Sequence, residues 1–455
     1  MKISFHGAAR EVTGSCHLVE VAKTKILLDC GLFQSGEPVD NEKQNDFDFD
    51  PSTIDYLLLS HAHLDHFGRI PLLVKRGFSG EVISTLPTKD LSALAMLDSA
   101  KYNARQGNKF SNRSENLFDT KDVNKALDLF GRTAVYEKPI RLNKKVTATY
   151  FNAGHIIGSA SIFLEVNEGD NIKKLVFSAD IGNNNKPIIT NPTLPPKSDL
   201  VIMESTYGDR NHTPVIKSLE EYYDAISSTV ASGGNVVNPV LAIERAQEML
   251  YILRAGLEAK KMPKNIKAFL DSPLAIKATN IVRNYPNYFN EETRGLIESG
   301  KDPFSFPNLE LTETVSESKA IRNTRRGAVI LAGSGMAMGG RVIYHLRDNL
   351  PRPESSIIIS NFVPEGSLLK KIIDGEKSVQ ILGEDIPVRA KIYTIGGFSA
   401  HAGQNELIKW QRNSGKPGIT FLVHGEENPM QTLATKLRRR GNQVKMPTLH
   451  ETFEV

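Results

Sequence analysis

Four residues of types that bind metal lie within six positions: His61, His63, Asp65 and His66 in the segment HAHLDH. The chain has only 11 histidines, so three of them in so short a segment depart strongly from chance. Imidazole nitrogens and carboxylate oxygens are common zinc ligands. The segment follows an apolar run at 56–59 that predicts a buried strand, and catalytic groups of α/β sheets gather at the carboxyl ends of strands. We therefore predict a zinc site here.

Three further candidate ligands each follow a predicted strand: His155 follows VTATYF, Asp180 ends KLVFSAD and His424 follows GITFLV. Alone, such a histidine is more often a hydrogen-bonded residue near a strand end, but the cluster at 61–66 favours ligation. Two metals ~3.5–4 Å apart can share a hydroxide and clamp the attacking and leaving oxygens of a phosphoryl displacement. We predict two zinc ions, with Asp180 bridging through its two oxygens. One ion would be held by His61, His63 and His155, and the other by Asp65, His66 and His424.

The remaining candidate residues near the strands receive less direct roles. Asp29 ends the strand TKILLD, and we expect it to accept a hydrogen bond from a ligand histidine, as carboxylates behind metal ligands do. Asp29 and Asp65 are counted among the catalytic residues. Cys16 and Cys30 are interpreted as small buried hydrophobic residues. Five histidines lack ligand spacing and are expected to be structural: His6, His17, His212, His345 and His450.

The elements around these residues predict two α/β domains, one inserted into the other. Short strands precede residue 60 and recur between 146 and 204. After residue 208, strands alternate with helices of ~10–15 residues, which indicates βαβ units and a mostly parallel sheet. Residues 301–314, with two prolines, are expected to be an irregular connection, and a strand near 388–395 is grouped with the first domain. The predicted domains are residues 1–207 with 391–455, and the insertion 208–390.

The composition limits the class of protein. The chain has 455 residues, of which 40% are hydrophobic and 24% charged, as in folded proteins of more than one domain. Two cysteines exclude a disulfide scaffold. No apolar run approaches the ~18–20 residues that cross a bilayer, and the N-terminus lacks the apolar core of a secretory signal. We expect a cytoplasmic protein without membrane contact, and a net charge of +4 is only weak support for a polyanionic partner.

The motifs resemble those of a known superfamily. His-x-His-x-Asp-His after a strand, followed by His155 and Asp180, is similar to the metallo-β-lactamase superfamily. Glu204 in MEST, His401 in GFSAHA and His424 in LVHG then follow in the order of the acidic motif and the two histidine motifs of β-CASP nucleases. GFSAHA resembles the form in the cleavage-and-polyadenylation nuclease subunit and its bacterial and archaeal relatives. Over nearly the whole chain, the resemblance implies an αββα sandwich with a two-metal site and an inserted α/β β-CASP domain.

The insertion supplies the candidate substrate-binding residues. Its glycine-rich turn at 333–340 lies between an apolar strand and a helix, where backbone N–H groups can approach a phosphate, so Ser334 and Gly335 are candidates. Arg245 and Ser367 lie near the starts of other predicted helices. A plain strand–helix turn, and an ion pair of Arg245 with a neighbouring glutamate, are the alternatives that we leave open. A basic repeat favours a solvated face over an RNA-binding stripe; it consists of Lys101, Arg105, Lys109 and Arg113.

Within the insertion, NPVLAIERAQEML resembles a family segment but departs from it at two positions. Leu241 replaces a phenylalanine and Glu244 replaces a glycine, so an aromatic surface is lost and an acid is gained. These departures put a detailed mapping of nucleic-acid contacts there in doubt.

We expect a zinc-dependent ribonuclease that cleaves single-stranded RNA endonucleolytically through a metal-bridging hydroxide. His401, held by Glu204, would protonate the leaving oxygen, and the products would carry 5′-phosphate and 3′-hydroxyl ends. A DNA-processing nuclease and a non-catalytic subunit of an RNA-processing complex remain the alternatives. A homodimer is also left open.

Overall fold

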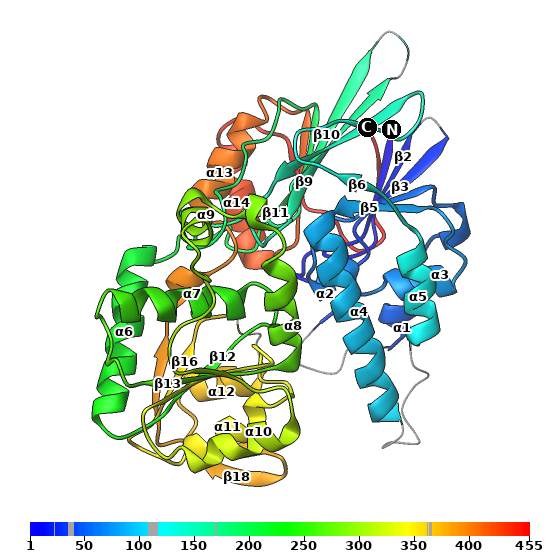
Figure 1. Cartoon of the computed structure of the whole chain (residues 1–455). Coiled ribbons are helices and arrows are strands. Elements are labelled where there is room, and N and C mark those ends of the chain that lie inside the picture. Colours follow the sequence, from blue (N-terminus) through cyan, green and yellow to red (C-terminus); the bar gives the residue numbers. More distant parts are fainter. Residues whose placement is uncertain are drawn as a thin grey trace. The chain divides into compact units, whose positions relative to one another are not determined.

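The structure is a computed structural model, shown in Figure 1, that describes residues 1–21, 23–34, 41–107, 117–167, 169, 171–361, 363 and 366–455. Lys109 and Arg113 of the basic repeat lie outside these residues. The chain divides into two compact units. The first comprises residues 1–184, 191–211 and 400–455, and the second comprises residues 185–190 and 212–399.

The first unit contains two seven-stranded sheets of mixed direction. One sheet consists, in spatial order, of β22 (Thr452–Glu454), β1 (Lys2–Phe5), β2 (His17–Val21), β3 (Thr24–Leu28), β4 (Tyr56–Leu58), β5 (Glu81–Thr85) and β6 (Phe130–Ala134). The other consists of β21 (Val444–Lys445), β20 (Ile419–Val423), β11 (Leu200–Glu204), β10 (Ile172–Phe177), β9 (Ala160–Asn167), β8 (Val146–Asn152) and β7 (Ile140–Arg141). The strands from β3 to β6 are parallel, as are those from β10 to β21, and the other neighbours are antiparallel.

The two sheets pack face to face through a core of aliphatic and aromatic side chains, including Ile26 and Leu58 from one sheet and Ile162 and Ile202 from the other. Each such side chain, when fully buried, stabilises the fold by about 1.5–3 kcal/mol. Helices cover the outer faces. α4 and α5 contact β5 and β6, while α13 and α14 pack on the second sheet through a cluster that includes Trp410. This arrangement confirms the predicted αββα sandwich.

The helices of the first unit begin where the sequence supplies caps. Asp119 and Asp122 form a capping box at the start of α5, in which each side chain accepts a hydrogen bond from the backbone N–H of the other residue. The helices are α1 (Asn41–Asn45), α2 (Leu64–Phe67), α3 (Ile70–Lys75), α4 (Leu86–Gly107), α5 (Thr120–Asp128), α13 (Gln404–Asn413) and α14 (Glu427–Arg438).

The second unit contains a six-stranded sheet in which every neighbouring pair is parallel. Its strands, in spatial order, are β14 (Leu309–Leu311), β13 (Lys267–Asp271), β15 (Ala328–Ala332), β12 (Val236–Pro239), β16 (Ser356–Ile359) and β19 (Lys391–Thr394). β12, β15 and β16 are buried along their whole length, as expected for parallel strands with both faces covered. The predicted parallel sheet is therefore confirmed.

Helices lie on both faces of this sheet. α11 and α12 pack on one face through a shared apolar core, and Figure 1 shows α7 and α8 on the opposite face. The helices are α6 (Val215–Ala231), α7 (Arg245–Glu258), α8 (Pro273–Val282), α9 (Glu291–Glu298), α10 (Val315–Ala320), α11 (Val342–Asn349) and α12 (Leu368–Ile373). A two-stranded hairpin of β17 (Ser378–Ile381) and β18 (Glu384–Pro387) completes the unit.

Two segments differ from the sequence-based expectation. The stretch 301–314 is not wholly irregular, because it contains the edge strand β14, which pairs with β13. Three residues of a partly exposed edge strand are too few to show a periodic pattern. The strand near 388–395, grouped by its pattern with the first domain, is β19, which pairs with β16 in the second unit.

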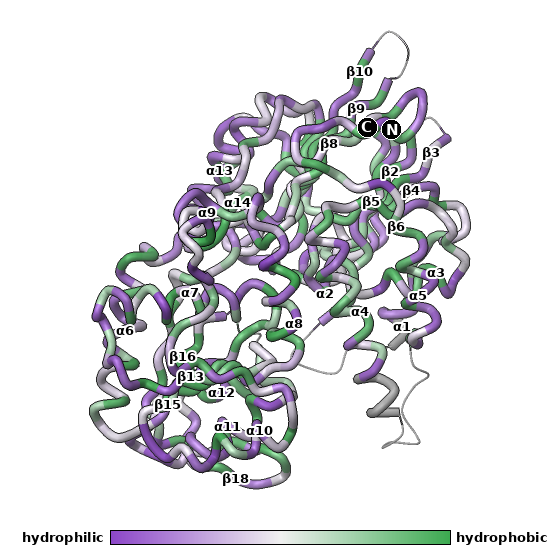
Figure 2. Tube along the Cα trace, in the orientation of Figure 1, coloured by the Kyte–Doolittle hydropathy of each residue, from purple (hydrophilic) through white to green (hydrophobic). Residues whose placement is uncertain are grey.

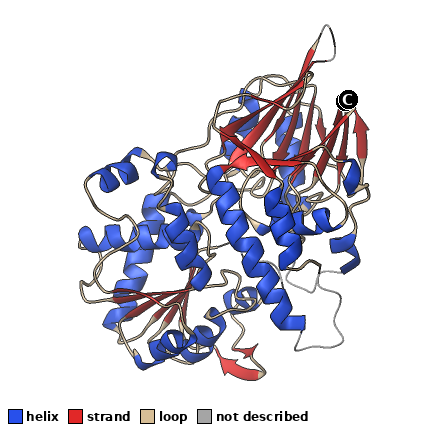
Figure 3. Cartoon of the chain, turned by 45° about the vertical axis from the view of Figure 1, so that its right-hand side comes forward, coloured by secondary structure: helices blue, strands red, loops and turns tan. Residues whose placement is uncertain are grey.

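Figure 3 shows the strands of each unit gathered into sheets with helices against them, and Figure 2 shows hydrophobic stretches running through the same sheets. Among the residues that the structure describes, no helix is both long and apolar enough to cross a membrane.

Candidate metal centre

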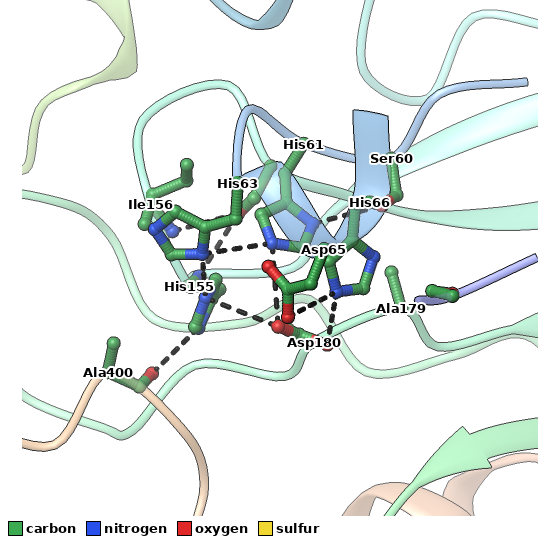
Figure 4. Close-up of polar contacts among 12 residues, drawn as sticks. Ser60, His61, His63, Asp65, His66, His155, Ile156, Ala179, Asp180 and Ala400 are labelled. Carbon is green, nitrogen blue, oxygen red and sulfur yellow. Dashed lines mark hydrogen bonds and ion pairs between the residues drawn. The ribbon is translucent and has the colours of Figure 1, made fainter. Parts of the chain in front are cut away.

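The predicted ligands lie together at strand ends of the first unit. The segment after β4 leads into α2, and His63 is the N-cap residue of that short helix. His155, Asp180 and His424 follow β8, β10 and β20. His424 adopts a positive φ of 47°, which turns the chain sharply at the end of its strand. Residues from four parts of the sequence thereby reach one place. Figure 4 shows the ligands between His61 and Asp180 directed toward one another.

The first ligand group consists of three imidazoles and a carboxylate. His63 Nδ1 lies 3.2 Å from His61 Nε2 and 3.1 Å from His155 Nε2. Asp180 Oδ2 lies 3.4 Å from His61 Nε2 and 3.5 Å from His155 Nε2. Their donor atoms all lie within 4.8 Å of one another, and three of the four residues are buried.

The second ligand group consists of Asp65, His66 and His424. The two Nε2 atoms lie 3.2 Å apart, and Asp65 Oδ2 lies 3.3 Å from His424 Nε2 and 3.7 Å from His66 Nε2. Asp180 also faces this group, with its Oδ1 3.3 Å from His66 Nε2 and 3.5 Å from His424 Nε2. Asp180 therefore directs one carboxylate oxygen toward each group, which is the arrangement that a bridging ligand requires.

The donor sets fit two zinc ions. With metal–nitrogen bonds of about 2.0–2.1 Å, two ligand atoms of a tetrahedral zinc ion lie about 3.3 Å apart. The facing nitrogens in both groups have this spacing. Asp180 Oδ1 is buried and has no hydrogen-bond partner among the described residues, and the same holds for His63 Nε2. Three imidazole nitrogens and a carboxylate that point at one another, with a carboxylate oxygen left unsatisfied, are the environment of a cation.

In the first ligand group the surroundings favour the protonation states of metal ligands, whereas around His66 the carboxylates of Asp180 and Asp65 outweigh burial and raise its pKa well above the usual value. Burial lowers the pKa of His63 to about 3, and His61 contributes in the same direction, so this imidazole is neutral near pH 7. Burial alone would raise the pKa of Asp180, but the facing imidazoles of His424 and His66 outweigh it and hold that pKa well below its usual range. Neutral imidazoles and ionised carboxylates are the forms that bind zinc.

Hydrogen bonds from behind orient the histidines. His66 Nδ1 donates to Asp29 Oδ2 at 2.7 Å, and the backbone N–H and hydroxyl of Ser60 donate to the same carboxylate at 2.8 Å each. His155 Nδ1 donates to the Ala400 carbonyl oxygen at 3.1 Å, which leaves its Nε2 free of hydrogen and directed toward Asp180. Sequence reasoning missed Ser60; its signal is its position next to His61, at the end of a predicted strand.

His401 lies beside the first ligand group. It follows the turn Gly396–Phe398, precedes α13 and forms an isolated β-bridge with Gly182. Its Nδ1 lies 3.2 and 3.3 Å from the two carboxylate oxygens of Glu204, and its Nε2 faces Asp180 Oδ2 at 4.0 Å. Burial lowers the pKa of His401, but the Glu204 carboxylate outweighs burial and raises it to about 9.

Glu204 is rigidly held for this contact. It ends β11, is completely buried, and its Oε1 accepts a hydrogen bond of 2.6 Å from the Ile181 backbone N–H. Ile181, which donates this hydrogen bond, is the residue directly after Asp180. The same short segment therefore positions the carboxylate shared by the two ligand groups and the carboxylate that holds His401.

The four predicted substrate-binding residues lie in the second unit. Arg245, the first residue of α7, is 6% exposed, and it donates to Glu248 Oε2 at 2.6 Å, to Asn361 Oδ1 at 3.2 Å and to the Phe398 carbonyl oxygen. The ion pair that the sequence left open as an alternative is therefore present. Asn361 Nδ2 in turn lies 3.5 Å from the Gly335 carbonyl oxygen, so a chain of polar contacts links Arg245 to the glycine-rich turn.

Ser334 and Ser367 hold turns rather than projecting freely. The hydroxyl of Ser334 donates to the Gly339 carbonyl oxygen at 3.3 Å. Gly335 packs so closely on Leu241 that an added Cβ would lie 2.7 Å from the Leu241 backbone nitrogen. Ser367 is the buried N-cap residue of α12, and its hydroxyl accepts a hydrogen bond from the Lys370 backbone N–H.

Glu244, which occupies the position of a family glycine, has a positive φ of 70°. That backbone conformation suits glycine and explains the family preference. The carboxylate is buried and lies 3.6 Å from Lys186 Nζ, which also pairs with Glu248 Oε1 at 3.0 Å. The acid gained at this position is thus part of a buried ion-pair cluster.

Family models match three segments of the chain. Residues 18–194 match a metallo-beta-lactamase superfamily domain, residues 246–372 a Beta-Casp domain, and residues 385–447 a Zn-dependent metallo-hydrolase RNA specificity domain. Each has its counterpart in the geometry: the sandwich with its ligand groups, the parallel sheet of the second unit, and the His401 and His424 segments. The chain belongs to the β-CASP family of the metallo-β-lactamase superfamily.

Particular relatives share this organisation. The chain is 39% identical to Ribonuclease TTHA0252 of Thermus thermophilus, over the full length of both chains. It is 31% identical to the transcription termination factor FttA of Methanocaldococcus jannaschii, over 96% of this chain and 69% of the factor. A crystal structure of a protein of unknown function from Enterococcus faecalis V583 matches with a TM-score of 0.56 and 14% identity, covering 99% of each chain, and shares the fold.

Proposed function

We propose that this chain is a zinc-dependent ribonuclease that hydrolyses phosphodiester bonds of single-stranded RNA within the strand. One observation carries the proposal: Asp180 directs its two oxygens toward two separate ligand groups, and His401 faces the same carboxylate from beside them. The printed names of the Thermus relative and of the domain matched at residues 385–447 support RNA as the substrate.

The proposed metal ligands are the members of the two ligand groups. His61, His63 and His155 would hold one zinc ion, and Asp65, His66 and His424 would hold the other. Two zinc ions at these positions would supply Lewis acidity, activating water as the nucleophile and stabilising the negative charge of the phosphate. The chain's own contribution is to hold the donors rigidly, because buried neutral imidazoles and hydrogen-bonded carboxylates need not reorganise during the reaction.

His401 supplies the proton for the leaving group. Hydrolysis breaks the bond between phosphorus and the 3′-oxygen, and that oxygen leaves readily only when it receives a proton. Glu204 accepts from His401 Nδ1, so the opposite nitrogen, Nε2, is the one that faces the site and donates. Because water is the nucleophile, one product carries a 5′-phosphate and the other a 3′-hydroxyl, and the RNA 2′-hydroxyl takes no part.

Substrate strands are retained mainly through their phosphates. The glycine-rich turn with Ser334 and Gly335, together with Arg245 and Ser367, is the proposed contact region of the second unit. The polar link from Arg245 through Asn361 to Gly335 suggests that Arg245 shapes this turn. Binding that depends on phosphate contacts should weaken steeply as salt is raised.

The test compares substrates on one zinc-reconstituted preparation. A labelled single-stranded RNA, the same sequence as DNA, a circular form of the RNA and a thioester are each incubated with the protein and with Asp180→Ala. We expect cleavage of the linear and circular RNA, 5′-phosphate ends, and continued cleavage when a single 2′-deoxy residue is placed at the cut position. Turnover of the thioester alone, cleavage that needs a free end, or 2′,3′-cyclic phosphate products would contradict the proposal.

A further inference from the structure

A second group of metal-binding side chains lies outside the candidate centre described above. His6 follows β1, Asp48 lies between α1 and the turn at 51–53, and His450 precedes β22. Donor atoms of these three residues all lie within 4.8 Å of one another, and none of the three belongs to the other ligand groups. No local sequence pattern indicates this group, because His6 and His450 are separated by 444 positions and meet where β22 pairs with β1.

The spacing of the donor atoms matches that of the candidate zinc centre. His6 Nδ1 and His450 Nδ1 lie 3.3 Å apart, and Asp48 Oδ2 lies 3.4 Å from His450 Nδ1. These distances are close to the separation of about 3.3 Å between two ligand atoms of a tetrahedral zinc ion with bonds of about 2.0–2.1 Å.

Hydrogen bonds alone cannot satisfy this arrangement. An imidazole nitrogen offers a single proton or a single lone pair, directed in the plane of the ring. His450 Nδ1 faces both the nitrogen of His6 and the carboxylate of Asp48, so one linear hydrogen bond leaves the other contact unmet. His6 is buried, with 4% of its surface exposed, and its other nitrogen has no partner among the described residues. A cation placed between the three donors satisfies all of them at once.

The surroundings allow a divalent cation. The positive charge of Arg69 acts on His6 and opposes a cation there, and Arg69 Nη1 donates to the Asp46 backbone oxygen at 3.0 Å. The carboxylates of Asp46 and Asp48 offset that charge. Asp46 Oδ2 lies 3.9 Å from His450 Nε2, the ring nitrogen that does not face the other donors, and a carboxylate in this position orients a ligand histidine. The Asp48 side chain is 53% exposed, so an ion and a water ligand can reach the site from solvent.

We propose that His6, Asp48 and His450 form an additional binding site for a divalent transition metal of the zinc type, completed by water. Two imidazoles and one carboxylate favour zinc over calcium or magnesium, which prefer all-oxygen shells. The site would join the end of β1, the loop after α1 and the segment before β22. We assign the site a structural role, because it includes neither a ligand of the candidate zinc centre nor the candidate proton donor His401.

Zinc content of the full chain tests the site. Wild type, Asp48→Asn and His450→Ala are dialysed to equilibrium against zinc-buffered solutions, and bound zinc per chain is measured. His212→Ala is the matched control, since His212 belongs to no ligand group in the described part of the chain. We expect wild type and the control to bind one zinc equivalent more than either site variant, and zinc to raise the thermal midpoint of wild type more than that of Asp48→Asn.

The comparison is differential, so it holds whatever the occupancy of the candidate centre. Asp48→Asn changes an exposed side chain and keeps a residue type that tolerates positive φ, so it answers the question even if His450→Ala does not fold. Equal zinc content in wild type and Asp48→Asn would overturn the proposal. Replacement of the extra zinc equivalent by calcium at the same concentration would overturn the assigned class of metal.

Discussion

Replacing Glu204 by glutamine should slow cleavage in a way that depends on pH. Glu204 is the nearest carboxylate to His401 and the strongest of the influences that raise the pKa of that histidine to about 9. Without the Glu204 charge, Asp180 and Asp65 still offset part of the effect of burial, and we expect the pKa to return to about 6.5, a change worth about 3.4 kcal/mol. At pH 8 the protonated fraction would then fall from about nine-tenths to about 3%, so kcat/KM should fall ~30-fold; at pH 6 it should fall less than ~2-fold.

The assay is the pH profile of RNA cleavage between pH 5.5 and 9.5 by wild type and Glu204→Gln, with zinc content measured on both. The basic limb of the profile should move from near 9 toward 6.5, while zinc content stays unchanged. Glu406→Gln is the matched control, since Glu406 caps α13 and contacts Asn184 and Gly403 instead of His401. An equal loss at every pH, or loss of zinc from Glu204→Gln, would refute the assignment of His401 as a proton donor held by Glu204.

Asp180→Ala should lose bound zinc from both ligand groups and lose cleavage altogether, as elemental analysis and an RNA assay can show; retention of two zinc equivalents would exclude the bridging role. Asp29→Ala should weaken zinc binding or activity by ~10–100-fold, because His66 loses the carboxylate that orients it; metal titration measures this, and unchanged affinity would contradict it. In the second unit, burial raises the pKa of Asp271, but hydrogen bonds led by that from His345 outweigh it and lower the pKa to about 2. This depressed pKa contributes about 2–3 kcal/mol to stability above pH ~4, and the contribution is lost as the pH falls through about 2. The difference in free energy of unfolding between wild type and Asp271→Asn should therefore shrink from pH 5 to pH 2. A difference that stays constant over this range would show that another group is responsible.

Sequence reasoning located the candidate metal centre because its signals are local. Three histidines within six residues, and single polar residues directly after apolar strands, mark sheet-edge positions even when their partners are far away in the chain. The inserted parallel sheet could be predicted for the same reason, since the alternation of strands and helices is read over short windows, whereas the αββα sandwich is what the family resemblance implies.

Features set by tertiary pairing could not be predicted. His6 and His450 meet only through the antiparallel pairing of β1 with β22, which no local pattern encodes. The pattern of β19 does not show that it pairs with β16, because an edge strand carries little information about which sheet it joins. Whether Arg245 pairs with Glu248 or faces a substrate depends on the depth of α7 in its unit, and only the structure shows that the guanidinium is buried.

The central claim is that RNA hydrolysis requires two zinc ions at the groups joined by Asp180. The most direct measurement is a titration of the chelator-treated protein with zinc, in which RNA cleavage and bound zinc are followed in the same samples. The account predicts no cleavage without zinc and recovery that reaches its plateau only when both candidate groups are filled, with Asp180→Ala inactive throughout. Cleavage by the metal-free protein, or full activity in Asp180→Ala, would contradict it.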